Sequence, residues 1–121
     1  MPRRQNKTQL RQRSLSGRLI LIVQPWQFAK LLAAAFEAQG AHTLTTKDAN
    51  TALPLADLPD LSAAVLDSNS DALGAKLAQR NIPFVLYSGR QEVTGNCAPA
   101  PLIRKPAPAN EVVATVEQLL L

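Results

Sequence analysis

AAVLD, residues 63–67, places an aspartate directly after a short apolar run. The same arrangement recurs in FVLYS (84–88), which ends in a serine, and in LIRK (102–105), which ends in a lysine. Short apolar runs between turn-forming residues are typical of buried parallel strands, so the three polar residues fall at strand carboxyl ends. Open α/β sheets carry their sites at that edge. A carboxylate, a hydroxyl and an ammonium there suit the transfer of a phosphoryl group to the carboxylate.

The first half of the chain alternates between strand and helix patterns. Leu19–Val23 is a short apolar run, and residues 28–36 carry apolar side chains at helical spacing, with Gly40 as a plausible stop. Residues 41–45 read as a weak edge strand, and Asp48 is placed to cap a short helix after it.

The second half continues the alternation. A strand at 61–66 is followed by a helix at about 72–80, and a last helix starts with Pro108 at its first position. Residues 89–101 are rich in Gly, Asn and Pro and show no convincing period. Five strands alternating with helices predict an α/β fold with a doubly wound five-stranded parallel sheet.

Length and charge distribution predict one domain and a separate basic segment. A chain of 121 residues suits one core, and 46% apolar but only 4% aromatic residues predict a core of Leu, Val, Ile and Ala. Residues 1–18 hold six of the 13 Lys and Arg and none of the nine acids. We therefore expect a disordered basic tail at 1–17 and a folded domain at 18–121.

Targeting segments and metal or disulfide patterns are not evident. The apolar run Leu19–Val23 is too short for a secretory signal core, and no stretch approaches the length of a membrane span. Cys97 is the only cysteine, which rules out an intramolecular disulfide and suits a reducing compartment. His42 has no second ligand at metal-binding spacing. We expect a cytoplasmic protein without a membrane span.

Three segments together resemble the receiver domain of bacterial two-component response regulators. They are VLDSN (65–69), PFVLYSG (83–89) and LIRKP (102–106), of which the lysine before a proline is the most specific. The resemblance extends over about residues 18–121. It implies a flavodoxin-like topology with the strand order 2-1-3-4-5.

The resemblance also assigns roles to the three polar residues. It implies that Asp67 is the phosphoacceptor, that Ser88 is the switch hydroxyl, and that Lys105 pairs with the phosphoryl oxygens. A carboxylate is a competent nucleophile toward phosphorus, and a hydroxyl and an ammonium are donors for the charged product. The partner implied is a histidine kinase or another signalling protein.

The sequence departs from the family pattern where the first strand ends. Family members carry two acidic residues there that hold Mg²⁺, whereas this chain has Gln24 and Pro25. The candidate Mg²⁺ ligands are therefore reduced to Asp67, Asn69 and Gln24. Each lost carboxylate forfeits several kcal/mol of attraction to the ion. We expect a weak or absent Mg²⁺ site, no other cofactor, and slow or absent phosphorylation.

Other departures lie around the lysine. Leu102 stands at an aromatic switch position of the family, and Ala107 stands where phenylalanine is frequent. We expect Asp67 and Lys105 to form an ion pair, Trp26 to pack over the space of the missing acids, and the partner to bind around the last helix and fifth strand.

Two functions remain open at this point, and neither is an enzyme. The first is a stand-alone, degenerate receiver that acts through protein–protein interaction, in which a homodimer is one arrangement. The second is a competent phosphoacceptor at Asp67, serving as a relay intermediate or phosphate sink for a histidine kinase. A flavodoxin-like enzyme would need a phosphate-binding loop in place of residues 24–27. We do not expect nucleic-acid binding, because the basic tail lacks aromatic residues for base stacking.

Overall fold

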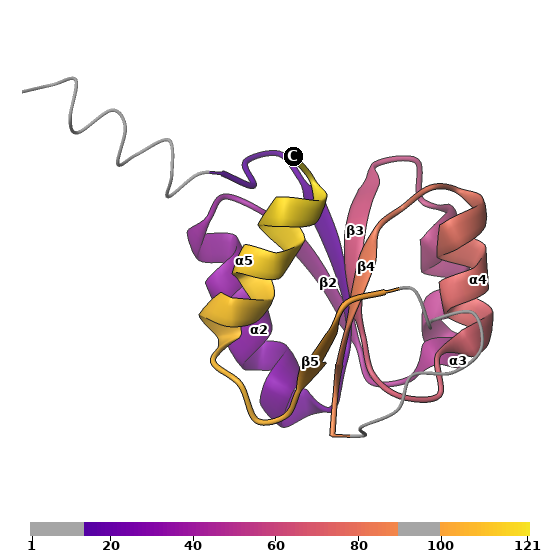
Figure 1. Ribbon diagram of the computed structural model, residues 1–121. Coiled ribbons are helices and arrows are strands. Elements are labelled where there is room, and N and C mark those ends of the chain that lie inside the picture. Colours follow the sequence, from indigo (N-terminus) through magenta and orange to yellow (C-terminus); the bar gives the residue numbers. More distant parts are fainter. Residues whose placement is uncertain (1–13, 90–99) are drawn as a thin grey trace, which may run out of the picture.

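The structure is a computed structural model that describes residues 14–89 and 100–121. Its centre is a parallel sheet with the strand order β2-β1-β3-β4-β5, which Figure 1 shows nearly edge-on. The strands are β1 (Leu19–Val23), β2 (His42–Thr46), β3 (Leu61–Leu66), β4 (Phe84–Ser88) and β5 (Leu102–Arg104). The predicted α/β fold, the five-stranded doubly wound sheet and the strand order 2-1-3-4-5 are confirmed.

Helices cover both faces of this sheet (Figure 1). One face carries α2 (Trp26–Ala38) and α5 (Ala109–Leu119), which contact each other. The other face carries α3 (Ala49–Ala52), its continuation as the 3-10 helix η1 (Leu53–Asp57), and α4 (Asp71–Gln79). Pro108 is the N-cap of α5 rather than its first helical residue, so the last helix starts one residue later than predicted.

The sheet separates two apolar clusters. Val65 belongs to the cluster with Phe36 of α2, whereas its neighbour Leu66 belongs to the cluster with Leu73 of α4. Since alternate residues of a strand point to opposite faces, β3 is buried on both sides, as its continuous apolar run predicts. Asp67 follows β3 directly and therefore lies at the carboxyl end of the central strand of the sheet.

The folded domain begins earlier than the sequence predicts. Leu15, which falls inside the predicted tail, is 1% exposed and belongs to the cluster that also holds Phe36. Its backbone N–H donates to the carbonyl oxygen of Gln39 at 3.1 Å. The predicted boundary at residue 18 therefore lies at least three residues too late, because one buried leucine in a polar segment leaves no periodic signal.

Gly40 permits this early segment to approach α2. Its φ of 92° lies in the left-handed region, and an added Cβ would stand 3.0 Å from the Cα of Ser16. Only glycine accepts both conditions without strain. The predicted helix stop at Gly40 is thus also the place where residues 14–17 pack against the domain.

Asp48 caps α3 as predicted. Its carboxylate accepts hydrogen bonds from the backbone N–H of Thr51 at 2.7 Å and from the Thr51 hydroxyl at 3.0 Å. These hydrogen bonds to the charged form lower the pKa of Asp48 below its ordinary value, even though the carboxylate is exposed.

Two parts of the chain lie outside the described residues. They are 1–13, which hold most of the predicted tail, and 90–99, which include Cys97. Within residues 14–89 and 100–121, no helix combines the length and apolar character needed to cross a membrane.

Candidate functional site

The turn after β3 holds Asp67 in place. One carboxylate oxygen, Oδ1, accepts the backbone N–H of Ser68 at 2.9 Å, and the Ser70 hydroxyl donates to the Asp67 carbonyl oxygen at 2.8 Å. Asn69 takes the left-handed conformation between them, with φ 65°. Asparagine is one of the few residues that adopt this region readily, so the turn is compatible with its sequence.

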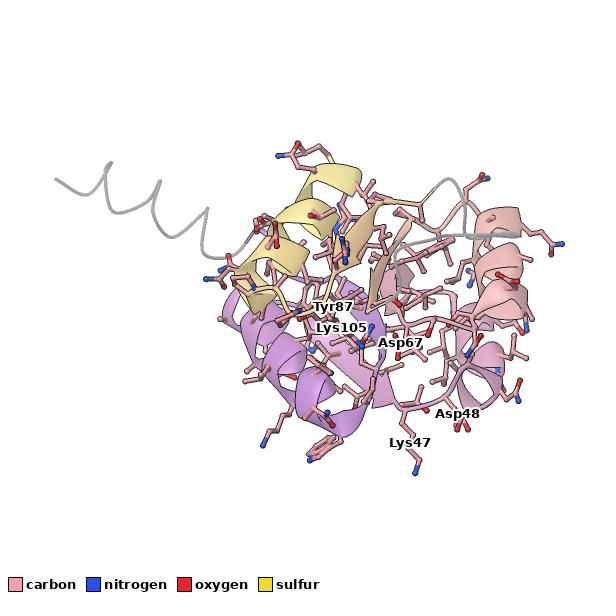
Figure 2. The ribbon with its side chains drawn as sticks, turned by 60° about the horizontal axis from the view of Figure 1, so that its bottom comes forward. Lys47, Asp48, Asp67, Tyr87 and Lys105 are labelled. Atoms are coloured by element: carbon pink, nitrogen blue, oxygen red, sulfur yellow. The ribbon has the colours of Figure 1, made fainter. Side chains whose placement is uncertain are left out.

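Lys105 reaches the same carboxylate from the end of β5. Its ammonium donates to Asp67 Oδ1 at 3.3 Å, and Figure 2 shows the two side chains together with Tyr87. The Lys105 side chain is 12% exposed and that of Asp67 27%. The predicted ion pair is confirmed. The backbone of Lys105 is also held in place, because its N–H donates to the Ser88 carbonyl oxygen at 3.0 Å. The peptide bond that follows, Lys105–Pro106, is cis.

Two aromatic rings complete the surroundings of the Lys105 ammonium. The nitrogen lies 4.3 Å from the ring centroid of Phe28 and 5.3 Å from that of Tyr87. The rings contact each other edge to face, with centroids 5.7 Å apart. Both distances fall within the range in which a cation is attracted to an aromatic ring.

Tyr87 also fixes the segment that follows Lys105. Its hydroxyl donates to the Ala107 carbonyl oxygen at 2.9 Å and accepts the Ala107 N–H at 3.2 Å. One side chain of β4 therefore satisfies both backbone groups of a loop residue.

Ser88 is the last residue of β4 and is 4% exposed. It pairs in the sheet with Arg104, directly before Lys105. Its position at the carboxyl edge agrees with the sequence analysis, with Ser88 lying inside the strand rather than after it.

Gln24 fills the end of β1. The side chain is fully buried, and its amide nitrogen Nε2 donates to the Tyr87 carbonyl oxygen at 3.1 Å. Its amide oxygen Oε1 is buried without a hydrogen-bond partner among the described residues. Pro25 follows as the N-cap of α2. An uncharged amide therefore occupies the strand end that borders Asp67.

Comparison with known proteins gives solved structures alone. No family model matches the sequence, and no curated protein matches it. The BeF3-activated conformation of SdrG from Pseudomonas melonis Fr1 is 27% identical, with a TM-score of 0.70 over 88% of this chain and 98% of that one. An orphan response regulator of H. pylori has a TM-score of 0.76 at 14% identity, over 88% of this chain and 99% of its own.

Receiver domains of other response regulators match equally well. The response regulator StyR has a TM-score of 0.72 at 19% identity over 87% of this chain, which spans 60% of StyR. The chain has the fold of a response-regulator receiver domain. The resemblance drawn from the three sequence segments is thereby confirmed at the level of the fold.

The donor set at this edge of the sheet does not fit Mg²⁺. Of the three candidate ligands, Asp67 supplies the only carboxylate, and its Oδ1 already accepts a hydrogen bond from the Lys105 ammonium. Gln24 directs its amide nitrogen to a backbone carbonyl, and Asn69 lies exposed in its turn. Mg²⁺ requires near-octahedral oxygen donors and dehydrates reluctantly. Among the described residues, no three His, Cys, Asp or Glu side chains come together.

Trp26 corrects one expectation. It was expected to pack over the space of the missing acids, but its side chain is 67% exposed at the start of α2. Gln24 turns inward and takes the buried position instead. Leu102 and Ala107, which stand where aromatic residues were expected from the resemblance, pack against the two opposite apolar clusters.

The sequence analysis missed the two rings at the site. It assigned Phe28 to the apolar stripe of a helix and Tyr87 to a strand, and both assignments are correct as far as they go. Amino-acid composition could have drawn attention to these rings, because only five residues of the whole chain are aromatic. Two of the five lie against the Lys105 ammonium.

Proposed function

We propose that this protein is a receiver-type signalling protein of the cytoplasm that binds a partner protein without a divalent metal and without phosphorylation. It is a binding protein rather than an enzyme, and the expected partner is a histidine kinase or another signalling protein. The observation that carries the proposal is the 3.3 Å ion pair between Asp67 and Lys105, beside a strand end occupied by Gln24.

The charges of the site explain why phosphorylation is not expected. Phosphoryl transfer depends on neutralising charge on the transferring group, for which metal ions and cationic side chains are the usual means. Among residues 14–89 and 100–121, the cation in contact with Asp67 is Lys105, and it is paired with the candidate nucleophile itself. A partner protein would therefore meet the same receiver surface, and bind it with the same affinity, whether or not a phosphodonor is present.

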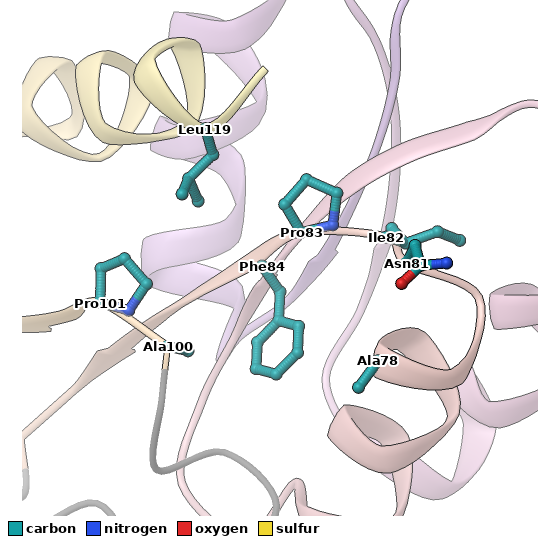
Figure 3. Close-up of a pocket in the computed structure, with 8 residues that line it drawn as sticks. All are labelled: Ala78, Asn81, Ile82, Pro83, Phe84, Ala100, Pro101 and Leu119. Carbon is teal, nitrogen blue, oxygen red and sulfur yellow. The ribbon is translucent and has the colours of Figure 1, made fainter. Parts of the chain in front are cut away.

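The proposed partner face lies around β5 and α5. Near the start of β5, a cavity of about 350 Å³ opens between the ends of α4 and α5, as Figure 3 shows. Phe84, Pro101 and Leu119 line it, and Leu119 is 38% exposed. An apolar side chain of a partner protein fits the chemistry of this cavity.

A phosphorylation assay tests the proposal without a known partner. Wild-type protein is incubated with acetyl phosphate and millimolar Mg²⁺, and its intact mass is measured. We expect no phosphoryl adduct on the wild type. The matched variant carries Gln24→Glu and Pro25→Asp, and it should gain an adduct that Asp67→Asn removes from it.

The same samples test signalling by association. Sedimentation of wild type and Asp67→Asn, each with and without phosphodonor and Mg²⁺, should give the same self-association constant in all four conditions. A wild-type adduct on Asp67, together with a tenfold change in association that Asp67→Asn abolishes, would favour the second function, a competent phosphoacceptor for a histidine kinase.

A further inference from the structure

We propose that Phe28 is the positioning residue that holds the Lys105 ammonium beside Asp67, so that Lys105 is the resident counter-ion of this carboxylate. The inference deepens the proposed function and rests on it for its consequence in signalling. Phe28 belongs to the first turn of α2, far in sequence from both charged residues.

The ammonium has three neighbours of complementary charge distribution. Asp67 Oδ1 lies at 3.3 Å, the Phe28 ring centroid at 4.3 Å and the Tyr87 ring centroid at 5.3 Å. The face of an aromatic ring is electronegative, and its attraction for a cation grows as water is removed. Since the Lys105 side chain is only 12% exposed, the rings act where water competes little.

Phe28 is the nearer ring and the one with no other polar role. Tyr87 uses its hydroxyl to bind Ala107, so its ring position is set by that contact. The position of Phe28 is set by the start of α2, where its backbone N–H donates to the Pro25 carbonyl oxygen at 3.0 Å. The backbone of Phe28 is therefore held by the helix and not by the lysine.

A lysine at this place needs such a partner. Its long side chain has many rotamers, and an ion pair with a partly exposed carboxylate does not by itself restrain them strongly. A ring beneath the ammonium favours the rotamer that faces Asp67. The site thereby obtains from its own chain the counter-charge that a metal would otherwise supply.

Competitive acetylation of lysines tests the proposal. Folded protein is treated with a trace of acetic anhydride, and the labelling of Lys105 is compared by peptide mass with that of the exposed Lys30 and Lys47. Phe28→Leu should raise the relative labelling of Lys105 by about threefold, as expected when a cation loses one ring contact. Phe28→Tyr, which keeps the ring, should label like the wild type.

The control is Phe36→Leu in the same helix. Phe36 is fully buried in the cluster against which Phe28 packs, and the rings at the Lys105 ammonium are those of Phe28 and Tyr87, so its loss loosens the core without removing the ring beneath the ammonium. Lys105 labelling in this variant should match the wild type. Equal increases in both variants, or no increase in Phe28→Leu, would overturn the proposal.

A graded substitution removes the dependence on folding of the leucine variant. Mono-, di- and trifluorinated phenylalanine at position 28 keep the shape of the ring and weaken its electronegative face step by step. Lys105 labelling should rise with each fluorine, and the same series at position 36 should leave it flat. A flat series at position 28 would also overturn the proposal. Neither experiment involves a partner or a phosphodonor, so their failure is distinct from failure of the proposed function.

Discussion

The carboxyl edge of the sheet contains two neighbouring regions that treat charge in opposite ways. At the ends of β3 and β5, Asp67 and Lys105 retain opposite charges and compensate each other at 3.3 Å. At the end of β1, Gln24 is neutral and fully buried, with one amide group bonded and the other without a partner among the described residues. The first region contains charges that neutralise one another within the chain, and the second contains an uncharged amide. The second region therefore depends on hydrogen bonding and the first on electrostatics, and substitutions can separate the two.

The largest effect is expected from Lys105→Ala, which leaves the Asp67 carboxylate without its counter-ion. We expect the free energy of unfolding to fall by about 2 kcal/mol, below the value for a fully buried pair because Asp67 is partly exposed. Chemical denaturation measures it. Adding Asp67→Asn to Lys105→Ala should recover a good part of the loss. A double variant as unstable as the sum of the single ones would mean that the two charges act independently.

Restoring acids at the end of β1 should make the Gln24 region charged, like the region of Asp67 and Lys105, and dependent on an added cation. Asp is a good N-cap residue, so Pro25→Asp is compatible with the start of α2, whereas Gln24→Glu replaces a buried donor with a charge. We expect the double variant to be less stable than the wild type in EDTA. At free Mg²⁺ of ten times its dissociation constant it should regain about 1.4 kcal/mol.

Thermal unfolding with and without Mg²⁺ measures that gain, and the wild type should show none. A wild type stabilised to the same extent would contradict the assignment of Gln24 and Pro25 as the cause of the poor metal fit.

Gln24→Met should have a smaller effect. Methionine has a similar length and removes both the hydrogen bond to Tyr87 and the amide oxygen that lacks a partner, so we expect a change within about 0.5 kcal/mol. Gln24→Ala, which opens a cavity, serves as the comparison and should be clearly more destabilising. Equal losses for both variants would show that the amide hydrogen bond, rather than volume, is what stabilises this region.

The smallest effect is expected at Asp48, outside both regions. Its pKa is lowered in the folded state, so its contribution is complete above the ordinary pKa of an aspartate and is lost as the pH falls through the lower folded value. Asp48→Ala should therefore lower the melting temperature slightly at pH 7 and hardly at all in strong acid. Asp60→Ala, in an exposed turn, is the control. An identical decrease at both pH values would rule out the cap as the cause.

The sequence predicted the sheet well because the relevant information is local. The apolar runs before Asp67 and Ser88, the helical spacing after β1 and the cap at Asp48 each depend on neighbours within one element. The ion pair followed from the rule that parallel strands share a carboxyl edge. These features require no knowledge of how helices pack on the sheet.

What the sequence did not predict depends on contacts between distant segments. The approach of Phe28 to Lys105 requires the start of α2 to lie beside Tyr87 of β4 and the residue that follows β5, and the burial of Leu15 requires the close passage at Gly40. The exposure of Trp26 and the burial of Gln24 depend on how α2 follows β1, which a list of residue types does not reveal. The predicted roles of Ser88 and of residues 1–13 stay predictions.

The double hydrogen bond between Tyr87 and Ala107 has a consequence for the timing of motion at the site. The amide proton of Ala107 exchanges with solvent only when the tyrosine hydroxyl releases it, and the same opening frees the segment that carries Lys105. The exchange rate of this single proton therefore reports how readily the lysine segment opens away from β4. A protein with a permanently paired Asp67 should show slow exchange there that neither Mg²⁺ nor phosphodonor alters.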